Sequence, residues 1–106
     1  MSSRIESCYK LVRDKIPEII KASGKTPKTE IITGELKTEY LELKLREEVK
    51  EYLEDKNIEE LADILEVLFA LSDNLGYSEE DLLNKRLEKK EERGGFKEGI
   101  VLKEVK

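Results

Sequence analysis

The chain has 106 residues, a length that fits a single domain over residues 1–106. Because 42% of its residues are charged and 38% are hydrophobic, one copy can build only a thin core. Its formal net charge of −5 argues against general nucleic-acid binding, which needs a basic face to neutralise phosphates. Histidine is absent, which excludes Ser-His and Cys-His catalytic pairs and histidine-ligated zinc, so any metal must have oxygen ligands, as magnesium and manganese do.

The sequence also predicts a cytoplasmic protein. Cys8 is the one cysteine, so no disulfide can form within the chain, as is usual in a reducing compartment. The opening stretch MSSRIESCYK lacks the apolar segment of a signal peptide. No run approaches the ~18 apolar residues of a membrane span. We therefore expect a soluble protein without a membrane partner.

The first third of the chain is predicted to hold a short helix and a short strand. Asp14 is placed to cap a helix over KIPEIIKAS, with Pro17 tolerated in the first turn and Gly24 ending it. Residues 29–33 have the β-branched content of a strand, which needs a partner to persist, and residues 100–105 are the other good candidate. We expect these two segments to pair as a short two-stranded β ribbon.

Two long helices are predicted in the middle of the chain, joined as an antiparallel hairpin. The first runs from about residue 35 to 55, with Thr33 as its cap. Glu48 lies at the edge of its apolar face. That face comprises Leu41, Leu45, Val49, Tyr52 and Leu53. Residues 55–57, Asp-Lys-Asn, permit a tight return. The second helix, about 58–75, is apolar nearly all round, as central helices are.

Gly76 ends the second long helix, and a last helix is predicted over residues 79–93. Ser78 opens it, with Asp81 completing a weak capping box, and Gly94-Gly95 stop it. The predicted fold class is therefore all-α: a compact antiparallel helical bundle, with the β ribbon joining the two ends of the chain. Because one copy has a thin core, we expect an oligomer that buries a further apolar helix face.

Four acids in the two long helices form the most informative pattern in the sequence. Glu48 and Glu51 lie one helical turn apart, as do Glu60 and Asp63, and a hairpin can set the two pairs opposite each other. The second pair falls in a core-facing apolar stripe, where unpaired carboxylates cost several kcal/mol. Four convergent carboxylates make a hard-oxygen site for one or two Mg²⁺ ions. The alternative is that these are ordinary helix acids paired with lysines and arginines.

Three segments carry a resemblance to a known group of proteins. EVKE at 48–51 followed by ELAD at 60–63 resembles the ExxE…ExxD signature of the all-α NTP pyrophosphohydrolase superfamily. That superfamily contains MazG-like enzymes, dimeric dUTPases and phosphoribosyl-ATP pyrophosphohydrolase. Members of one MazG-like subgroup begin with a segment similar to KLVRDKIPEII (10–20) and finish with one similar to EERGGFKEGIVL (91–102). Together the three segments span nearly the whole chain.

The resemblance implies a hydrolase that depends on Mg²⁺, with Mn²⁺ as a substitute. Such enzymes cleave a nucleoside triphosphate between its α- and β-phosphates into a monophosphate and pyrophosphate, as in the house-cleaning removal of non-standard nucleotides. Glu48, Glu51, Glu60 and Asp63 match the metal ligands and are the predicted catalytic residues. Members of the superfamily typically work as dimers or tetramers, which implies a homodimer or homotetramer here.

Several basic residues are candidates for contacting the phosphates of such a substrate. Arg13 and Lys15 belong to the first outer segment, Arg93 belongs to the last, and Lys89 lies just before the last; Lys44 and Lys10 are weaker candidates. For the basic residues near the start of the chain, surface solvation is the alternative interpretation.

Two other functions stay open at this point. A phosphoribosyl-ATP pyrophosphohydrolase breaks the same kind of bond and differs only in its substrate. A catalytically inactive helical interaction module with the same fold is favoured by the absence of tryptophan, a residue suited to stacking on a nucleotide base.

Overall fold

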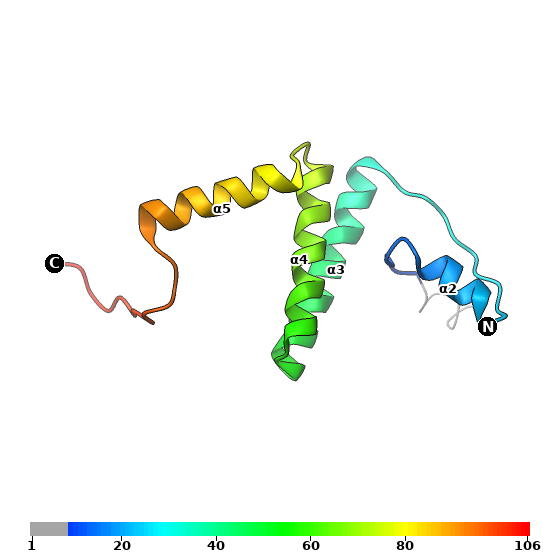
Figure 1. The fold of residues 1–106 in the computed structure, drawn as a ribbon, viewed down its shortest axis with the longest axis horizontal. Coiled ribbons are helices and arrows are strands. Elements are labelled where there is room, and N and C mark those ends of the chain that lie inside the picture. Colours follow the sequence, from blue (N-terminus) through cyan, green and yellow to red (C-terminus); the bar gives the residue numbers. More distant parts are fainter. Residues whose placement is uncertain (1–8) are drawn as a thin grey trace.

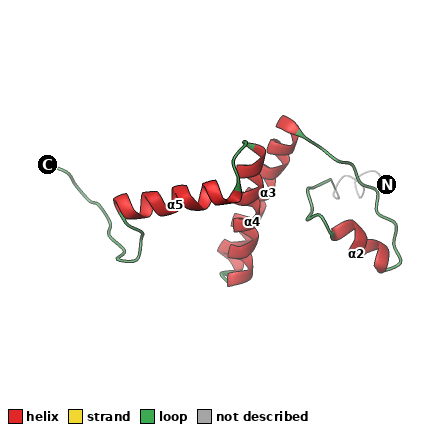
Figure 2. Cartoon of the chain, turned by 45° about the horizontal axis from the view of Figure 1, so that its top comes forward, coloured by secondary structure: helices red, strands yellow, loops and turns green. Residues whose placement is uncertain are grey.

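A computed structural model of the chain describes residues 9–106, which contain four α-helices and no strand (Figures 1 and 2). Cys8 lies outside the described residues. The helices are α2 (Ile16–Ala22), α3 (Gly34–Asp55), α4 (Ile58–Asn74) and α5 (Glu79–Arg93). Because the described residues contain helices and no strand, the predicted all-α class is confirmed. Among these helices, none combines the length and the hydropathy needed to cross a lipid bilayer.

The hairpin of α3 and α4 is the centre of the molecule, as predicted. Lys56 adopts a left-handed conformation (φ 49°, ψ 52°), which ends α3 and reverses the chain. Asn57 then caps α4, because its side-chain oxygen accepts a hydrogen bond of 2.9 Å from the backbone N–H of Glu60. The break was predicted, but the Asn57 cap was not. The two helices pack against each other side by side (Figure 1).

The start of α2 differs from its prediction. Its N-cap is Lys15, without a capping side chain, so the cap assigned to Asp14 is wrong. Lys15 already has helical backbone angles, and the N–H of Ile16 donates to the carbonyl of Arg13 at 3.0 Å. A backbone turn therefore takes the place of the side-chain cap. Pro17 lies in the first turn, as predicted.

Two further helix ends can be compared with their predictions. Thr33 occupies the N-cap position of α3 in an extended conformation, but its side chain makes no capping hydrogen bond. Ser78 and Asp81 form the predicted capping box of α5: the Ser78 Oγ accepts from the Asp81 N–H at 3.0 Å, and the Asp81 Oδ2 accepts from the Ser78 N–H at 2.9 Å. α5 ends before Gly94 and projects away from the hairpin (Figure 1).

The predicted β ribbon and the predicted compactness are both wrong. Residues 29–33 and 100–105 have no regular structure, and they lie toward opposite ends of the molecule (Figures 1 and 2). Ile31 and Ile100, one in each segment, are 90% and 83% exposed. The described chain has a radius of gyration of 18.1 Å, whereas a compact domain of this length has about 13 Å. Since α5 does not fold back, the tail cannot reach the segment that precedes α3.

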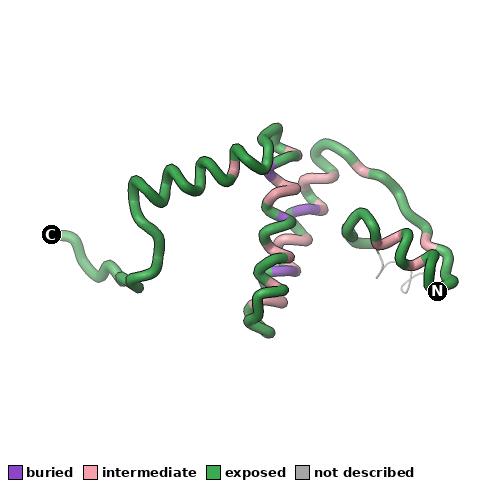
Figure 3. Tube along the Cα trace, viewed as in Figure 1, coloured by how far each residue is buried: buried purple, intermediate pink, exposed green. Residues whose placement is uncertain are grey.

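The core lies between α3 and α4 and is small. Among the described residues, Leu41 and Val67 are the buried hydrophobic side chains, and Glu48 and Ser72 are buried with them (Figure 3). Glu48 was expected at the edge of the apolar face but is only 7% exposed, whereas Val49 is 38% exposed. The line of α3 that faces α4 therefore passes through the acid and not through the neighbouring valine.

Candidate metal centre

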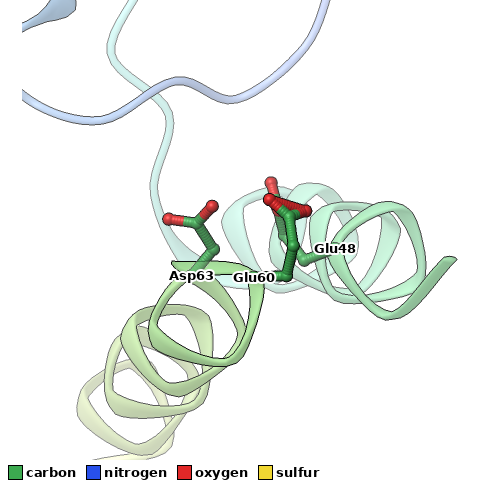
Figure 4. A group of neighbouring side chains, drawn as sticks. All are labelled: Glu48, Glu60 and Asp63. Carbon is green, nitrogen blue, oxygen red and sulfur yellow. The ribbon is translucent and has the colours of Figure 1, made fainter. Parts of the chain in front are cut away.

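Three carboxylates from the hairpin gather at one place. Glu48 comes from α3, and Glu60 and Asp63 come from the first two turns of α4. One carboxylate oxygen from each lies within 4.8 Å of the others. Figure 4 shows the three groups directed to the same side of the hairpin. Because the connection between the helices is short, the register brings Glu48 of the first acidic pair to both acids of the second pair, so three of the four predicted acids converge.

Glu51 lies beside this group without joining it. A hydrogen bond with the Glu48 side chain raises the pKa of Glu51, and the negative charges of Glu48 and Glu60 raise it further. The fourth predicted acid therefore feels the field of the cluster, although its oxygen is not one of the three that converge.

Glu60 is the least satisfied member of the cluster. Its Oε2 atom is shielded from solvent and has no hydrogen-bond partner. Loss of solvation raises the pKa of Glu60, and the negative charge of Asp63 adds to the rise. A carboxylate oxygen that has lost water without gaining a donor is destabilised unless a cation or proton compensates it.

Two basic side chains partly neutralise the acids. Arg13 Nη2 donates to Asp63 Oδ1 at 2.6 Å, and Lys44 Nζ lies 3.4 Å from Glu48 Oε1. Burial lowers the pKa of Lys44, but the bonds and charges of Glu47 and Glu48 outweigh it and raise the pKa overall. The interpretation as ordinary ion-paired acids therefore fits Asp63 and Glu48. It does not account for Glu60 or Glu51.

Lys10 belongs to the same basic group but is farther from the cluster. Its Nζ lies 3.9 Å from Glu47 Oε2, and Glu47 also contacts Lys44 at 3.2 Å. Glu47 therefore connects the segment before α2 to α3 without contributing to the convergent oxygens.

A cleft of about 490 Å³ opens beside the acids, between the segment before α2 and the α3–α4 hairpin. Glu48 and Asp63 lie on its wall, and Leu41 and Val67 form part of its apolar floor. Its basic lining residues are Arg13, Lys15, Lys37 and Lys44. Three of these four were predicted as phosphate contacts. The spacing of Lys37, Leu41, Lys44 and Glu48 along one side of α3 could have indicated the fourth.

Lys89 and Arg93 are not brought to the acids within one chain. Both lie on the exposed side of α5, which leaves the far end of α4 and extends away from the cluster (Figure 1). Neither residue lines the cleft. A role in contacting phosphate therefore requires another chain or a different position of α5.

No protein family model, curated protein or solved structure matches this chain. A function must therefore be inferred from the residues of the site.

Proposed function

We propose that this chain is a Mg²⁺-dependent nucleoside triphosphate pyrophosphohydrolase. The observation that carries the proposal is the convergence of Glu48, Glu60 and Asp63 beside a cleft. Glu48 and Asp63 line this cleft together with four basic side chains. Acids that would hold a cation and bases that would hold phosphates thus line the same space. This pairing suits a substrate that binds as its magnesium complex.

The donor set fits a hard divalent cation. The three groups supply only carboxylate oxygens, the ligands that Mg²⁺ and Mn²⁺ prefer. Oxygens about 2.1 Å from one Mg²⁺ are at most ~4.2 Å apart. The cluster, whose oxygens lie within 4.8 Å, needs only small side-chain rotations to share an ion. An ion there would also satisfy the unpartnered Glu60 Oε2.

Glu48, Glu60 and Asp63 would hold the ion, with Glu51 as the adjacent fourth acid. When bound, a metal ion in such a site polarises a phosphoryl oxygen and offsets the charge of the diphosphate leaving group. The chain's own basic residues do the rest of the binding. Arg13 has the planar fork that suits phosphate, and Lys15, Lys37 and Lys44 add positive charge along the cleft. Water adds across the α–β anhydride: a new bond forms between its oxygen and one phosphorus, the bridging P–O bond breaks, and the products are nucleoside monophosphate and pyrophosphate.

A panel of nucleotides tests the proposal. Purified protein with Mg²⁺ is incubated with standard, deoxy and damaged nucleoside triphosphates and with phosphoribosyl-ATP, and pyrophosphate is measured. We expect release from at least one triphosphate. Release from phosphoribosyl-ATP alone would instead identify that compound as the substrate.

An inactive interaction module is the second candidate function, and the many exposed apolar side chains of residues 9–106 favour it. A thermal-shift titration distinguishes this module from the enzyme. A ligand that binds only the folded state stabilises it by mass action. We expect Mg²⁺ to raise the melting temperature more than NaCl at equal ionic strength. No specific shift, together with no pyrophosphate from the panel, contradicts the proposal.

A further inference from the structure

A second, smaller pocket lies directly beside the cleft. It has a volume of about 130 Å³ and is lined by residues 9–11 and by one side of α3. Leu11 and Lys44 line both the pocket and the cleft, one from each wall. The two spaces therefore adjoin, and a ligand held in the cleft can extend into the pocket.

The positions along α3 give the separation of the two spaces. Tyr40 and Glu47 line the pocket, and the residue after each, Leu41 and Glu48, lines the cleft. Consecutive residues lie ~100° apart around a helix. On a helix about 10–12 Å in diameter, that angle covers roughly 9–10 Å of surface. A sugar bridges such a distance, so a nucleotide with its phosphates in the cleft can place its base in the pocket.

Tyr9 and Tyr40 give the pocket two aromatic side chains. Tyr9 belongs to the segment before α2 and is 72% exposed, whereas Tyr40 lies half-buried on α3. Nucleobases stack on aromatic rings of this kind in many binding sites. The exposed ring of Tyr9 therefore offers a surface that a base would cover, and the chain needs no tryptophan to bind one.

Three charged side chains also line the pocket. Lys44 donates to Glu47 Oε1 at 3.2 Å, and the Nζ atom of Lys10 lies 3.9 Å from Glu47 Oε2. Because an ammonium group has three donor hydrogens, each lysine keeps donors for a ligand after it has paired with Glu47. The ring carbonyl oxygens of a pyrimidine base are suitable acceptors for these donors.

The volume of the pocket distinguishes between the two kinds of base. A cavity of about 150 Å³ holds one benzene ring. A pocket of about 130 Å³ therefore suits the single ring of a pyrimidine better than the double ring of a purine. We propose that this pocket binds the base of a pyrimidine nucleotide, stacked on Tyr9 and Tyr40 with its carbonyl oxygens toward the two lysines. The inference rests on the proposed function, which places the phosphates of the same nucleotide in the cleft.

Calorimetric binding of monophosphates tests the pocket without turnover. Uridine 5′-monophosphate should bind several-fold more tightly than adenosine or guanosine 5′-monophosphate, whose bases have two rings. Ribose 5-phosphate, which has no base, should bind more weakly than uridine 5′-monophosphate by roughly tenfold or more. The proposal is overturned if uridine 5′-monophosphate does not bind, or if a purine nucleotide or ribose 5-phosphate binds as tightly.

Variants of the two tyrosines locate the base. Tyr9→Leu and Tyr40→Leu should each weaken the binding of uridine 5′-monophosphate roughly tenfold and leave that of ribose 5-phosphate unchanged. Tyr40→Phe keeps the ring and should bind like wild type. The matched control Tyr77→Leu removes a tyrosine that is 61% exposed and lies outside the pocket, and it should change neither affinity.

Circular dichroism verifies that each variant is folded. If Tyr40→Leu loses its helicity, Tyr9→Leu still tests the pocket, because Tyr9 lies outside the helices. Equal binding of uridine 5′-monophosphate by Tyr9→Leu and Tyr77→Leu contradicts the proposal.

The triphosphate panel separates this inference from the proposed function. If pyrophosphate is released with the same kcat/KM from purine and pyrimidine triphosphates, the base pocket is overturned and the proposed function stands. If uridine 5′-monophosphate binds as described and no triphosphate is hydrolysed, the pocket stands and the enzyme does not.

Discussion

At the scale of single residues, Glu60 determines how the metal-free site behaves with pH. Its pKa is raised by lost solvation and by Asp63, so the folded state holds a proton that the unfolded state releases more readily. A raised pKa of this kind contributes stability at low pH that is lost as the pH rises through the folded-state pKa. At pH 7 the metal-free site is therefore a source of instability.

We expect Glu60→Gln to raise the melting temperature of the metal-free protein at pH 7 by a few degrees, because it removes one negative charge from the cluster. The gain should shrink at pH 4, where Glu60 in the wild type is protonated. Thermal melts in EDTA, followed by circular dichroism at the two pH values, check this. The variant should also lose the specific stabilisation by Mg²⁺. A melting temperature lowered at pH 7 would refute this account of Glu60.

Arg13 occupies part of the site that a cation would take. Its guanidinium lies 2.6 Å from Asp63 Oδ1, so it competes with a metal ion for that oxygen. We expect Arg13→Gln to tighten Mg²⁺ binding a few-fold in calorimetry, and to raise the KM for nucleotide roughly tenfold, because a charged phosphate contact is lost. The control Arg46→Gln, on α3 but outside the cleft, should change neither value. Unchanged Mg²⁺ affinity in Arg13→Gln argues against competition.

At the scale of elements, the turn between α3 and α4 sets the register that brings the acids together. The Asn57 cap holds the first turn of α4, from which Glu60 projects. Asn57→Ala should lower the free energy of unfolding by about 1 kcal/mol. Urea denaturation measures this, with Asn84→Ala, at an exposed position within α5, as the control. A loss no larger than that of the control means that the cap does not stabilise the hairpin.

The sequence predicted the helices and the convergence of three of the four acids because both depend on local features. Periodicity placed α3, α4 and α5 to within a residue or so, and a break of only two residues between α3 and α4 left little freedom in the register. The rotation of α3 about its own axis could not be predicted, because its apolar residues spread over a wide arc. Either Glu48 or Val49 could therefore have faced α4. The strands were mispredicted because β-branched residues favour a strand only where a sheet is available to pack against. In the described part of the chain, residues 29–33 have no sheet to join.

At the scale of the whole molecule, an elongated chain with a small core should gain stability from association. If two copies pack together through the exposed apolar side chains of α4, folding is coupled to assembly, and the melting temperature rises with protein concentration. We expect a rise of several degrees between 1 and 100 µM. Thermal melts over that range measure it. A melting temperature independent of concentration indicates that one copy is stable alone.

Assembly also offers a place for the two basic residues of α5. Lys89 and Arg93 belong to α5, which extends away from the α3–α4 hairpin (Figure 1). We therefore expect any contact of these residues with phosphate to be made with the other copy. An equimolar mixture of Glu48→Gln with Lys89→Ala/Arg93→Ala, unfolded and refolded together, should then recover about a quarter of wild-type activity, since half of random dimers contain one intact site. Activity no higher than that of the separate variants shows that the two residues are not shared in this way.

The most direct measurement compares Mg²⁺-dependent product formation by wild type and Glu48→Gln, with Glu54→Gln as a control acid on the same helix and outside the cluster. In both wild type and Glu54→Gln, the amount of pyrophosphate released should equal the amount of nucleoside monophosphate released. Glu48→Gln should be slower by ~100-fold or more, with unchanged helicity, because it removes a charged ligand at the centre of the cluster. Retained turnover in Glu48→Gln, or release of orthophosphate in place of pyrophosphate, would contradict the assignment.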